Sequence, residues 1–118
     1  MSTILVVDDE LPIRELVARV LTRRGHRVIA CGNAPEALAV TDALDLLVVD
    51  LVLPEMNGRD LTEALRARWP NLPVVLMSGY LSGQDQMPPP SVFLQKPMLP
   101  SAMIQAVEGL LRGQEIRN

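Results

Sequence analysis

The sequence is poor in cysteine and in aromatic residues. Cys31 is the one cysteine among 118 residues, which excludes an internal disulfide bond and a metal site built from several cysteines. We expect Cys31 to behave as a small buried hydrophobic residue. One Trp, one Tyr and one Phe supply all the aromatic side chains, so the core must consist of aliphatic residues and methionine.

Long apolar runs and a strong charge imbalance are also missing. No apolar run approaches the ~20 residues that a membrane-spanning helix needs, and the N-terminus has no signal-peptide pattern. The net charge is only −3, which argues against direct binding of nucleic acid or of a membrane surface. We therefore expect a cytoplasmic protein.

The sequence does contain a repeated alternation of short apolar runs and helical segments. The apolar runs predict strands over residues 4–7, 27–31, 46–49, 74–77 and 92–94. Apolar spacing and helix-start signals predict helices over residues 11–24, 33 to about 41, 58–69, and 100 to about 111. Strands this apolar, separated by helices, are typical of a doubly wound parallel sheet with helices on both faces. We predict a single α/β domain over residues 1–118.

The connection between the fourth and fifth strands departs from this alternation. Residues 80–90 hold few apolar anchors and end in Pro88-Pro89-Pro90, which no helix tolerates. At most one helical turn fits there. We therefore predict that the fourth helix of the alternation is missing or reduced to a turn.

Polar residues directly follow four of the predicted strands. The residues at these strand ends are Asp8, Asp9, Asp50, Ser78 and Lys96. The carboxyl ends of parallel strands meet at one edge of a sheet, where open α/β proteins bind ligands, so we expect these side chains to gather there. Each residue taken singly has a plainer explanation as a helix cap, a turn residue or a solvated strand end. Their coincidence at one edge favours a functional site.

The acids in this set indicate a bound cation. Carboxylates packed closely repel one another unless one is protonated or a cation neutralises them. Oxygen-only ligands suit a hard ion, most naturally Mg²⁺.

The motifs at the strand ends together resemble the receiver domain of two-component response regulators. The matching stretches are ILVVDD, VVDLVLPEMNG, LMSG and FLQKP, and the resemblance covers Ser2 to about Leu111. It implies a flavodoxin-like fold with strand order 2-1-3-4-5. It also implies a domain that takes a phosphoryl group from a sensor histidine kinase or a histidine phosphotransfer protein, switches conformation and loses the group again. Such a domain catalyses its own phosphorylation and dephosphorylation and is not a conventional enzyme.

The resemblance implies a role for each acidic residue of the site. Asp50, within VVDLVLPEMNG, would be the phosphoacceptor. Asp9 would ligate Mg²⁺, and Asp8 would do so directly or through water. Asp50 and the backbone carbonyl of Val52 would complete the protein's share of the coordination.

The resemblance also implies roles around the phosphoryl group. Ser78 and Lys96 would bind its oxygens, and Ser78 with Phe93 would form the conformational switch. The Lys96-Pro97 peptide would be cis. Two apolar positions, Val52 and Tyr80, would flank the phosphoryl group and modulate its lifetime by excluding water, unless Tyr80 merely packs over the shortened loop.

Partners follow from the same resemblance. The motifs Ser78-Gly79-Tyr80 and FLQKP are most similar to receivers associated with sensor histidine kinases. The basic residues of the first helix form either a solvated face or a docking surface for a phosphohistidine domain. The usual dimer and output face of receivers includes the fourth helix, so we expect a monomer or a weak dimer.

Three other functions are alternatives to a receiver domain. A small Mg²⁺-dependent phosphatase with an aspartyl nucleophile needs acids spaced D-x-D after the first strand, whereas Asp8 and Asp9 are adjacent. A nucleotide-binding module needs a glycine-rich loop at that place. A receiver-like interaction module that is never phosphorylated is disfavoured by the complete acidic set with Ser78 and Lys96, and a phosphorylation assay separates it.

Overall fold

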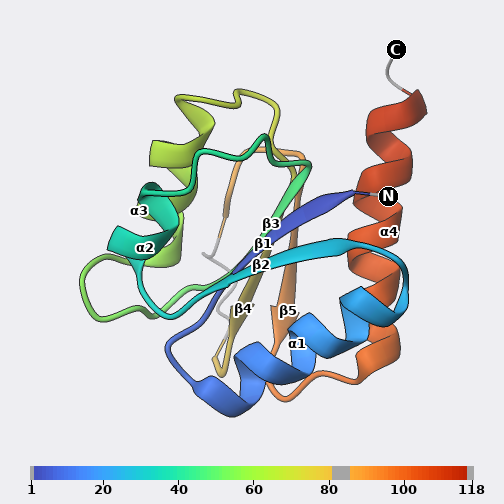
Figure 1. The fold of residues 1–118 in the computed structure, drawn as a ribbon, viewed down its shortest axis with the longest axis horizontal. Coiled ribbons are helices and arrows are strands. Elements are labelled where there is room, and N and C mark those ends of the chain that lie inside the picture. Colours follow the sequence, from blue (N-terminus) through green and yellow to red (C-terminus); the bar gives the residue numbers. More distant parts are fainter. Residues whose placement is uncertain (1, 81–85, 117–118) are drawn as a thin grey trace.

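The computed structural model describes residues 2–80 and 86–116 (Figure 1). Strands and helices alternate along this part of the chain, except between the last two strands. The elements are β1 (Thr3–Val7), α1 (Leu11–Arg23), β2 (Arg27–Cys31), α2 (Ala34–Leu38), β3 (Leu46–Asp50), α3 (Gly58–Arg66), β4 (Val74–Ser78), β5 (Ser91–Gln95) and α4 (Pro100–Ile116).

The five strands form one parallel sheet in the order β2-β1-β3-β4-β5. Strand β1 lies between β2 and β3, with Val7 opposite both Cys31 and Val49. Helices α1 and α4 cover one face of the sheet, and α2 and α3 cover the other (Figure 1). The predicted doubly wound fold and its strand order are therefore confirmed.

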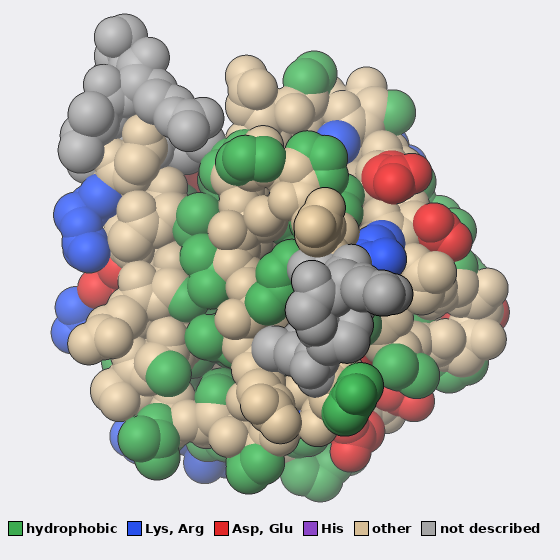
Figure 2. Space-filling view, turned by 180° about the vertical axis from the view of Figure 1, so that it is seen from behind, with side chains coloured by type: hydrophobic (Ala, Val, Ile, Leu, Met, Phe, Trp, Pro, Cys, Tyr) green, Lys and Arg blue, Asp and Glu red, His purple; other side chains and the backbone are tan. Residues whose placement is uncertain are grey.

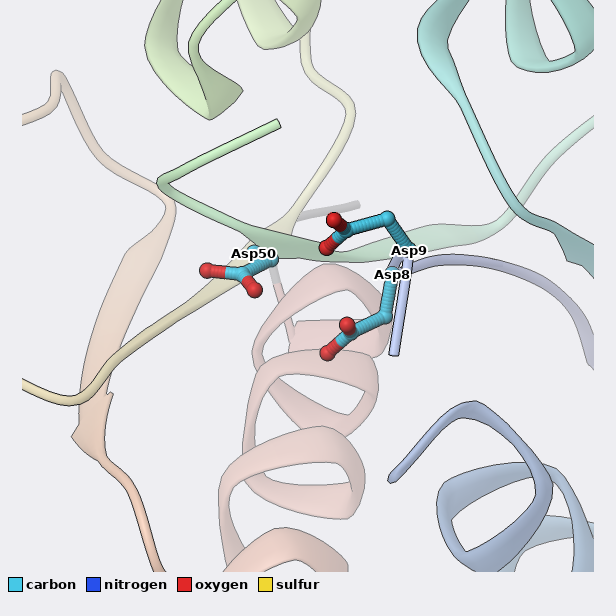
Figure 3. A group of neighbouring side chains, drawn as sticks. All are labelled: Asp8, Asp9 and Asp50. Carbon is cyan, nitrogen blue, oxygen red and sulfur yellow. The ribbon is translucent and has the colours of Figure 1, made fainter. Parts of the chain in front are cut away.

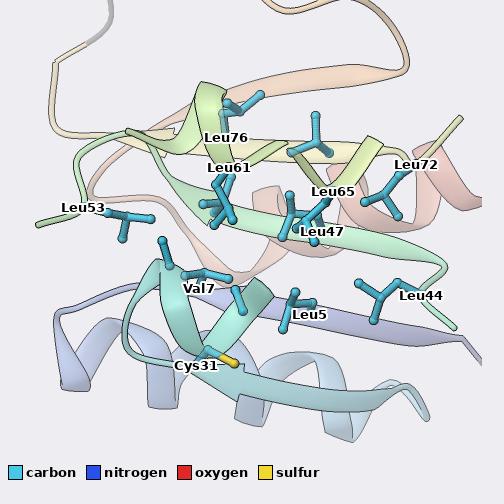
Figure 4. Packing of buried hydrophobic residues seen from close by; sticks show 14 of the residues in the cluster. Leu5, Val7, Cys31, Leu44, Leu47, Leu53, Leu61, Leu65, Leu72 and Leu76 are labelled. Atoms are coloured by element: carbon cyan, nitrogen blue, oxygen red, sulfur yellow. The ribbon is translucent and has the colours of Figure 1, made fainter. Parts of the chain in front are cut away.

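The core consists of two aliphatic layers, one on each face of the sheet. Successive side chains of a strand point to opposite faces. In β1, Leu5 and Val7 therefore pack toward α2 and α3 (Figure 4), whereas Ile4 and Val6 pack toward α1 and α4. Burying each such side chain stabilises the fold by about 1.5–3 kcal/mol. Both faces of the sheet are closed, so polar chemistry is left to the strand ends.

Two helices end earlier than their sequence pattern predicts. Helix α2 ends at Leu38 instead of about residue 41, and α3 ends at Arg66 instead of residue 69. The guanidinium of Arg68, in the turn after α3, donates hydrogen bonds to the carbonyls of Leu38 and Val40, which satisfies carbonyls at the end of α2. No helix in the described part of the chain is long and apolar enough to span a membrane.

Residues 79–80 and 86–90 of the β4–β5 connection contain no helix, and the predicted loss of the fourth helix agrees with this. Residues 81–85 of that prediction lie outside the described residues. The Arg66 guanidinium instead holds the connection, since it donates to the carbonyls of Pro88 at 2.7 Å, Pro90 at 2.9 Å and Leu72 at 3.1 Å. Figure 2 shows the face that carries β5 and α4, where apolar side chains gather along the boundary between these elements.

Candidate functional site

Three aspartates meet at the carboxyl edge of the sheet (Figure 3). Asp8 directly follows β1 and Asp50 is the last residue of β3, so the pairing of β1 with β3 brings them to the same edge. One carboxylate oxygen from each of Asp8, Asp9 and Asp50 lies within 4.8 Å of the others. Asp8 and Asp50 are buried, whereas Asp9 is exposed. The gathering of acids expected from the strand ends is therefore observed.

Lys96 supplies a positive charge to this cluster. Its ammonium donates hydrogen bonds to Asp50 Oδ2 at 2.7 Å and to Asp8 Oδ2 at 2.9 Å. A third bond, at 3.0 Å, goes to Glu10 Oε1. Burial alone would lower the pKa of Lys96, but the hydrogen bonds to three carboxylates outweigh burial and raise this pKa above its usual value. These hydrogen bonds therefore favour the charged form of Lys96.

Glu10 is a member of this network that the sequence reasoning left without a role. Its carboxylate binds Lys96, and its backbone N–H donates to Asp8 Oδ1 at 2.8 Å. The only sequence signal was its place as the third acid in a run that follows β1.

The surroundings of Asp8 make its negative charge costly. The side chain has no exposed surface, and burial raises its pKa above the usual value although hydrogen bonds from Lys96 and from the Glu10 amide oppose this. The nearby carboxylate of Asp50 raises the pKa of Asp8 further. Additional positive charge at this place would therefore favour the ionised form.

Asp50 is held from several directions. Its Oδ1 accepts a hydrogen bond from the Val52 N–H at 3.1 Å, while Oδ2 binds Lys96. Helix α3 begins directly against its backbone, because a Cβ on Gly58 would overlap the Asp50 carbonyl oxygen and come within 3.0 Å of Leu51 Cα. The position and orientation of Asp50 thus depend on a close contact between a loop and a helix start.

Ser78 ends β4 at the same edge and is buried. Its Oγ donates to the Tyr80 carbonyl at 2.7 Å and accepts from the Tyr80 N–H at 3.1 Å. Its own carbonyl accepts the backbone N–H of Lys96 at 2.7 Å, which joins the ends of β4 and β5. The Ser78 hydroxyl is therefore hydrogen-bonded to the loop that follows β4. Ser78 lines the same hollow as Val52 and Tyr80.

The two positions predicted to modulate the phosphoryl lifetime and the predicted switch aromatic differ in burial. The side chains of Val52 and Tyr80 are 72% and 78% exposed and line one hollow with Ser78. Phe93 lies opposite Leu76 in the sheet and packs, partly buried, against the core layer on the side of α2 and α3. The Lys96-Pro97 peptide is cis, as the resemblance implied.

The residues at this edge suit a hard divalent cation. The three aspartates offer oxygen ligands only, which is the donor set that Mg²⁺ prefers. Burial, and to a smaller extent the carboxylate of Asp50, raises the pKa of Asp8, so a cation bound beside it would favour its ionised form. The donor chemistry and the electrostatics therefore both fit the predicted ion.

Comparison with known proteins gives a consistent family. A family model described as the response regulator receiver domain matches residues 4–108. A solved CheY-like receiver domain from Methanospirillum hungatei JF-1 is 25% identical, with a TM-score of 0.91 over 100% of this chain and 99% of that chain. The solved receiver domain of the hybrid histidine kinase CckA is 31% identical, with a TM-score of 0.80 over 92% of this chain and 98% of that chain.

Curated relatives are longer proteins. The alkaline phosphatase synthesis transcriptional regulatory protein SphR of Synechococcus elongatus is 32% identical over 94% of this chain and 49% of its own length. The sensor kinase CckA of Brucella abortus is 31% identical over 97% of this chain and 13% of its own length. The chain spans about half the length of the first curated relatives, 51% and 49%. The family match over most of the chain, the strand order and the acidic edge agree, and the chain therefore belongs to the response regulator receiver domain family.

Proposed function

We propose that Asp50 is the phosphoacceptor of this receiver domain. The observation that carries the proposal is the place of its carboxylate, buried at the end of β3 with Oδ2 at 2.7 Å from the Lys96 ammonium. An oxygen of Asp50 attacks the phosphorus of the donor, and an O–P bond forms. The bond from phosphorus to the donor breaks, and the departing group takes its electron pair. For a phosphohistidine donor that group is the imidazole.

The side chains around Asp50 then act on the transferred group. Phosphoryl transfer is catalysed mostly by positioning and by neutralising charge on the phosphoryl oxygens. Lys96 already contacts Asp50 and exchanges part of that contact for a phosphoryl oxygen. The Ser78 hydroxyl turns from the Tyr80 carbonyl toward another oxygen. Phe93 shifts in response, which biases an equilibrium between two conformations.

Mg²⁺ is the proposed cofactor, held by the carboxylates of Asp8, Asp9 and Asp50 and by the carbonyl of Val52. When bound, it supplies positive charge that neutralises the transferring phosphoryl oxygens. Asp8 gains most from the ion, because burial disfavours its charged form.

A histidine kinase or a histidine phosphotransfer protein is the proposed donor, since receiver domains accept phosphoryl groups from histidine kinases. Helix α1 starts beside the acidic edge and exposes Leu11 and Leu16. Arg14 is turned inward, where it donates to the Asp8 carbonyl at 2.9 Å. Arg19 and Arg23 are exposed, as is Glu15, so the face that docks the donor carries apolar residues and charges of both signs.

Val52 and Tyr80 form an apolar rim that slows hydrolysis of the phosphorylated Asp50. Both side chains are largely exposed and line one hollow, so they stand where water would approach. Replacing Tyr80 with Ala should speed the loss of phosphate in a decay assay on gels that retard phosphoproteins. An unchanged decay rate would limit Tyr80 to packing over the loop.

Labelling by a small acyl phosphate tests the phosphoacceptor. With Mg²⁺ and acetyl phosphate, the parent chain should become labelled and Asp50→Asn should not. Asp60→Asn is the matched control, because Asp60 is an exposed aspartate in the first turn of α3. Undiminished labelling of Asp50→Asn contradicts the assignment. Absence of labelling in the parent favours a phosphorylation-independent interaction module.

A further inference from the structure

The hollow that contains Asp50 also contains a glutamate. It encloses about 360 Å³, at the small end of the range for ligand pockets, and so admits one small group. Its described lining residues include Glu10, Ile13, Asp50, Val52, Lys96 and Pro97. A donor that transfers its phosphoryl group in line to Asp50 has its leaving group on the far side of the phosphorus, in this hollow. The lining therefore affects which leaving group departs readily.

Glu10 reaches this hollow from the residue before α1. Its Oε1 accepts a hydrogen bond from the Lys96 ammonium at 3.0 Å, and the same ammonium donates to Asp50 Oδ2 at 2.7 Å. One cation thus joins the two carboxylates, which places Glu10 close to the bond that a donor at Asp50 breaks. The Glu10 side chain is 56% exposed, so a donor can reach it. Among the described residues Lys96 is its one hydrogen-bond partner, so Oε2 can accept another bond.

Glu10 is the acid of this network that the proposed Mg²⁺ does not bind. The ion neutralises the three aspartates of the site, and Glu10 is not among its ligands. Lys96 exchanges part of its present contacts for a phosphoryl oxygen in the proposed transfer, which weakens its bond to Glu10. Mg²⁺ and Lys96 both serve the phosphoryl oxygens, which are the same for every donor. Glu10 therefore acts on the part in which donors differ, the leaving group.

We propose that Glu10 makes this domain selective for phosphoimidazole donors, such as a phosphohistidine, over acyl phosphates. When Asp50 attacks such a donor, the O–P bond forms, the P–N bond breaks, and its electron pair stays on the ring nitrogen. A ring that carries a proton on its other nitrogen leaves as neutral imidazole, and Glu10 accepts a hydrogen bond from that N–H. An acyl phosphate instead breaks a P–O bond and leaves as a carboxylate, whose growing negative charge Glu10 repels. This inference rests on the proposed role of Asp50.

Two small donors that differ in the leaving group test this selectivity in the whole chain. Acetyl phosphate and N-phosphoimidazole deliver the same phosphoryl group, and gels that retard phosphoproteins give a second-order rate constant of labelling for each. Mg²⁺ is kept saturating for every variant, at a concentration set from its affinity in calorimetry.

For Glu10→Gln we expect labelling about three-fold faster from acetyl phosphate and about three-fold slower from phosphoimidazole, because one negative charge beside the leaving group is lost. Glu63→Gln is the matched control, since it alters an exposed glutamate of α3 outside the described lining of the hollow. Both of its rate constants should equal those of the parent chain.

The outcomes separate this inference from the proposed function. Opposite changes for the two donors support it, because a disturbed fold or a released Lys96 would move both rate constants in the same direction. Equal changes for the two donors, or none, overturn the role of Glu10 and leave Asp50 as the acceptor. The same opposite changes in Glu63→Gln also overturn that role, since net charge alone would then be the cause. Failure of both donors to label the parent chain overturns both proposals.

Discussion

Gly58→Ala tests how tightly α3 is packed against the backbone of Asp50. A Cβ at this position overlaps the Asp50 carbonyl oxygen and lies 3.0 Å from both Asp50 C and Leu51 Cα. All three are backbone atoms, which cannot rotate away as the end of a side chain can. Overpacking of this kind costs typically about 1–3 kcal/mol. The better helix propensity of alanine returns at most about 1 kcal/mol.

We therefore expect Gly58→Ala to lower the free energy of unfolding by about 1–2 kcal/mol, which corresponds to a fall in Tm of several degrees. Urea and thermal unfolding followed by circular dichroism measure both quantities. Gly113→Ala is the matched control, because Gly113 lies in α4 and a Cβ there meets nothing within 4 Å. That variant should gain up to about 1 kcal/mol from helix propensity. If Gly58→Ala proves as stable as the control, the close contact between α3 and Asp50 is refuted.

Three further changes test charges and hydrogen bonds away from that contact. Burial raises the pKa of Asp8, so the buried side chain favours folding when it is protonated, below its usual pKa of 3.8, and this stabilisation is lost as pH rises. Asp8→Asn should therefore raise Tm at pH 7 without Mg²⁺. The gain in Tm should vanish in acid, where Asp8 of the parent is protonated. Hydrogen bonds from Arg24, more than the one with His26, lower the pKa of Glu108 to about 2. Glu108→Gln should therefore be slightly less stable than the parent at pH 7. Urea titrations of both proteins should show this difference in stability fading as pH falls from 4.5 to about 2. Arg66→Ala removes hydrogen bonds to three backbone carbonyls and should lower the free energy of unfolding by about 2 kcal/mol. Amide exchange in β5, followed by mass spectrometry, should become faster. Unchanged exchange would contradict the view that Arg66 holds the β4–β5 connection in place.

Because residues 79–80 and 86–90 form no helix, Arg66 is an important partner of the β4–β5 connection. A run of three prolines offers carbonyl acceptors but no N–H donors, so it cannot satisfy itself by helix formation. Arg66 has five N–H donors in a rigid fork and bonds two carbonyls of this run together with that of Leu72. The β4–β5 connection is thus joined to the end of α3, on the face of the sheet opposite α4. We expect any conformational change that begins at Ser78 to be felt at α3.

The strands were the most predictable part of the fold. The first two predicted strands differ from β1 and β2 by at most one residue, because apolar β-branched runs of this length form strands buried on both faces. Helix ends were less predictable. At the early end of α2 the Leu38 carbonyl accepts a hydrogen bond from Arg68, 30 positions away in the sequence, and no local pattern encodes such a partner.

For the candidate site, the sequence predicted which residues meet, whereas their chemical roles are not yet tested. Asp8, Asp9, Asp50, Ser78 and Lys96 were predicted to meet because parallel strands must end at a common edge, and the structure brings them to that edge. Their roles as metal ligands, acceptor and phosphoryl-binding groups stay predictions until phosphorylation is measured.

The sequence by itself determined the order of elements, the closed aliphatic core and the residue types at the strand ends, because apolar periodicity and strand-end position are local properties of a chain. Only the tertiary structure decided how the charges are shared. The bond between Lys96 and Asp8 joins residues 88 positions apart, and the extra partner, Glu10, reaches Lys96 from the same loop. Arg59 of α3 likewise shares a hollow with Ser78, the last residue of β4. Such contacts depend on how far side chains reach from one element to another. The charges also depend on burial, which raises the pKa of Asp8. Neither property can be predicted from the local order of residues.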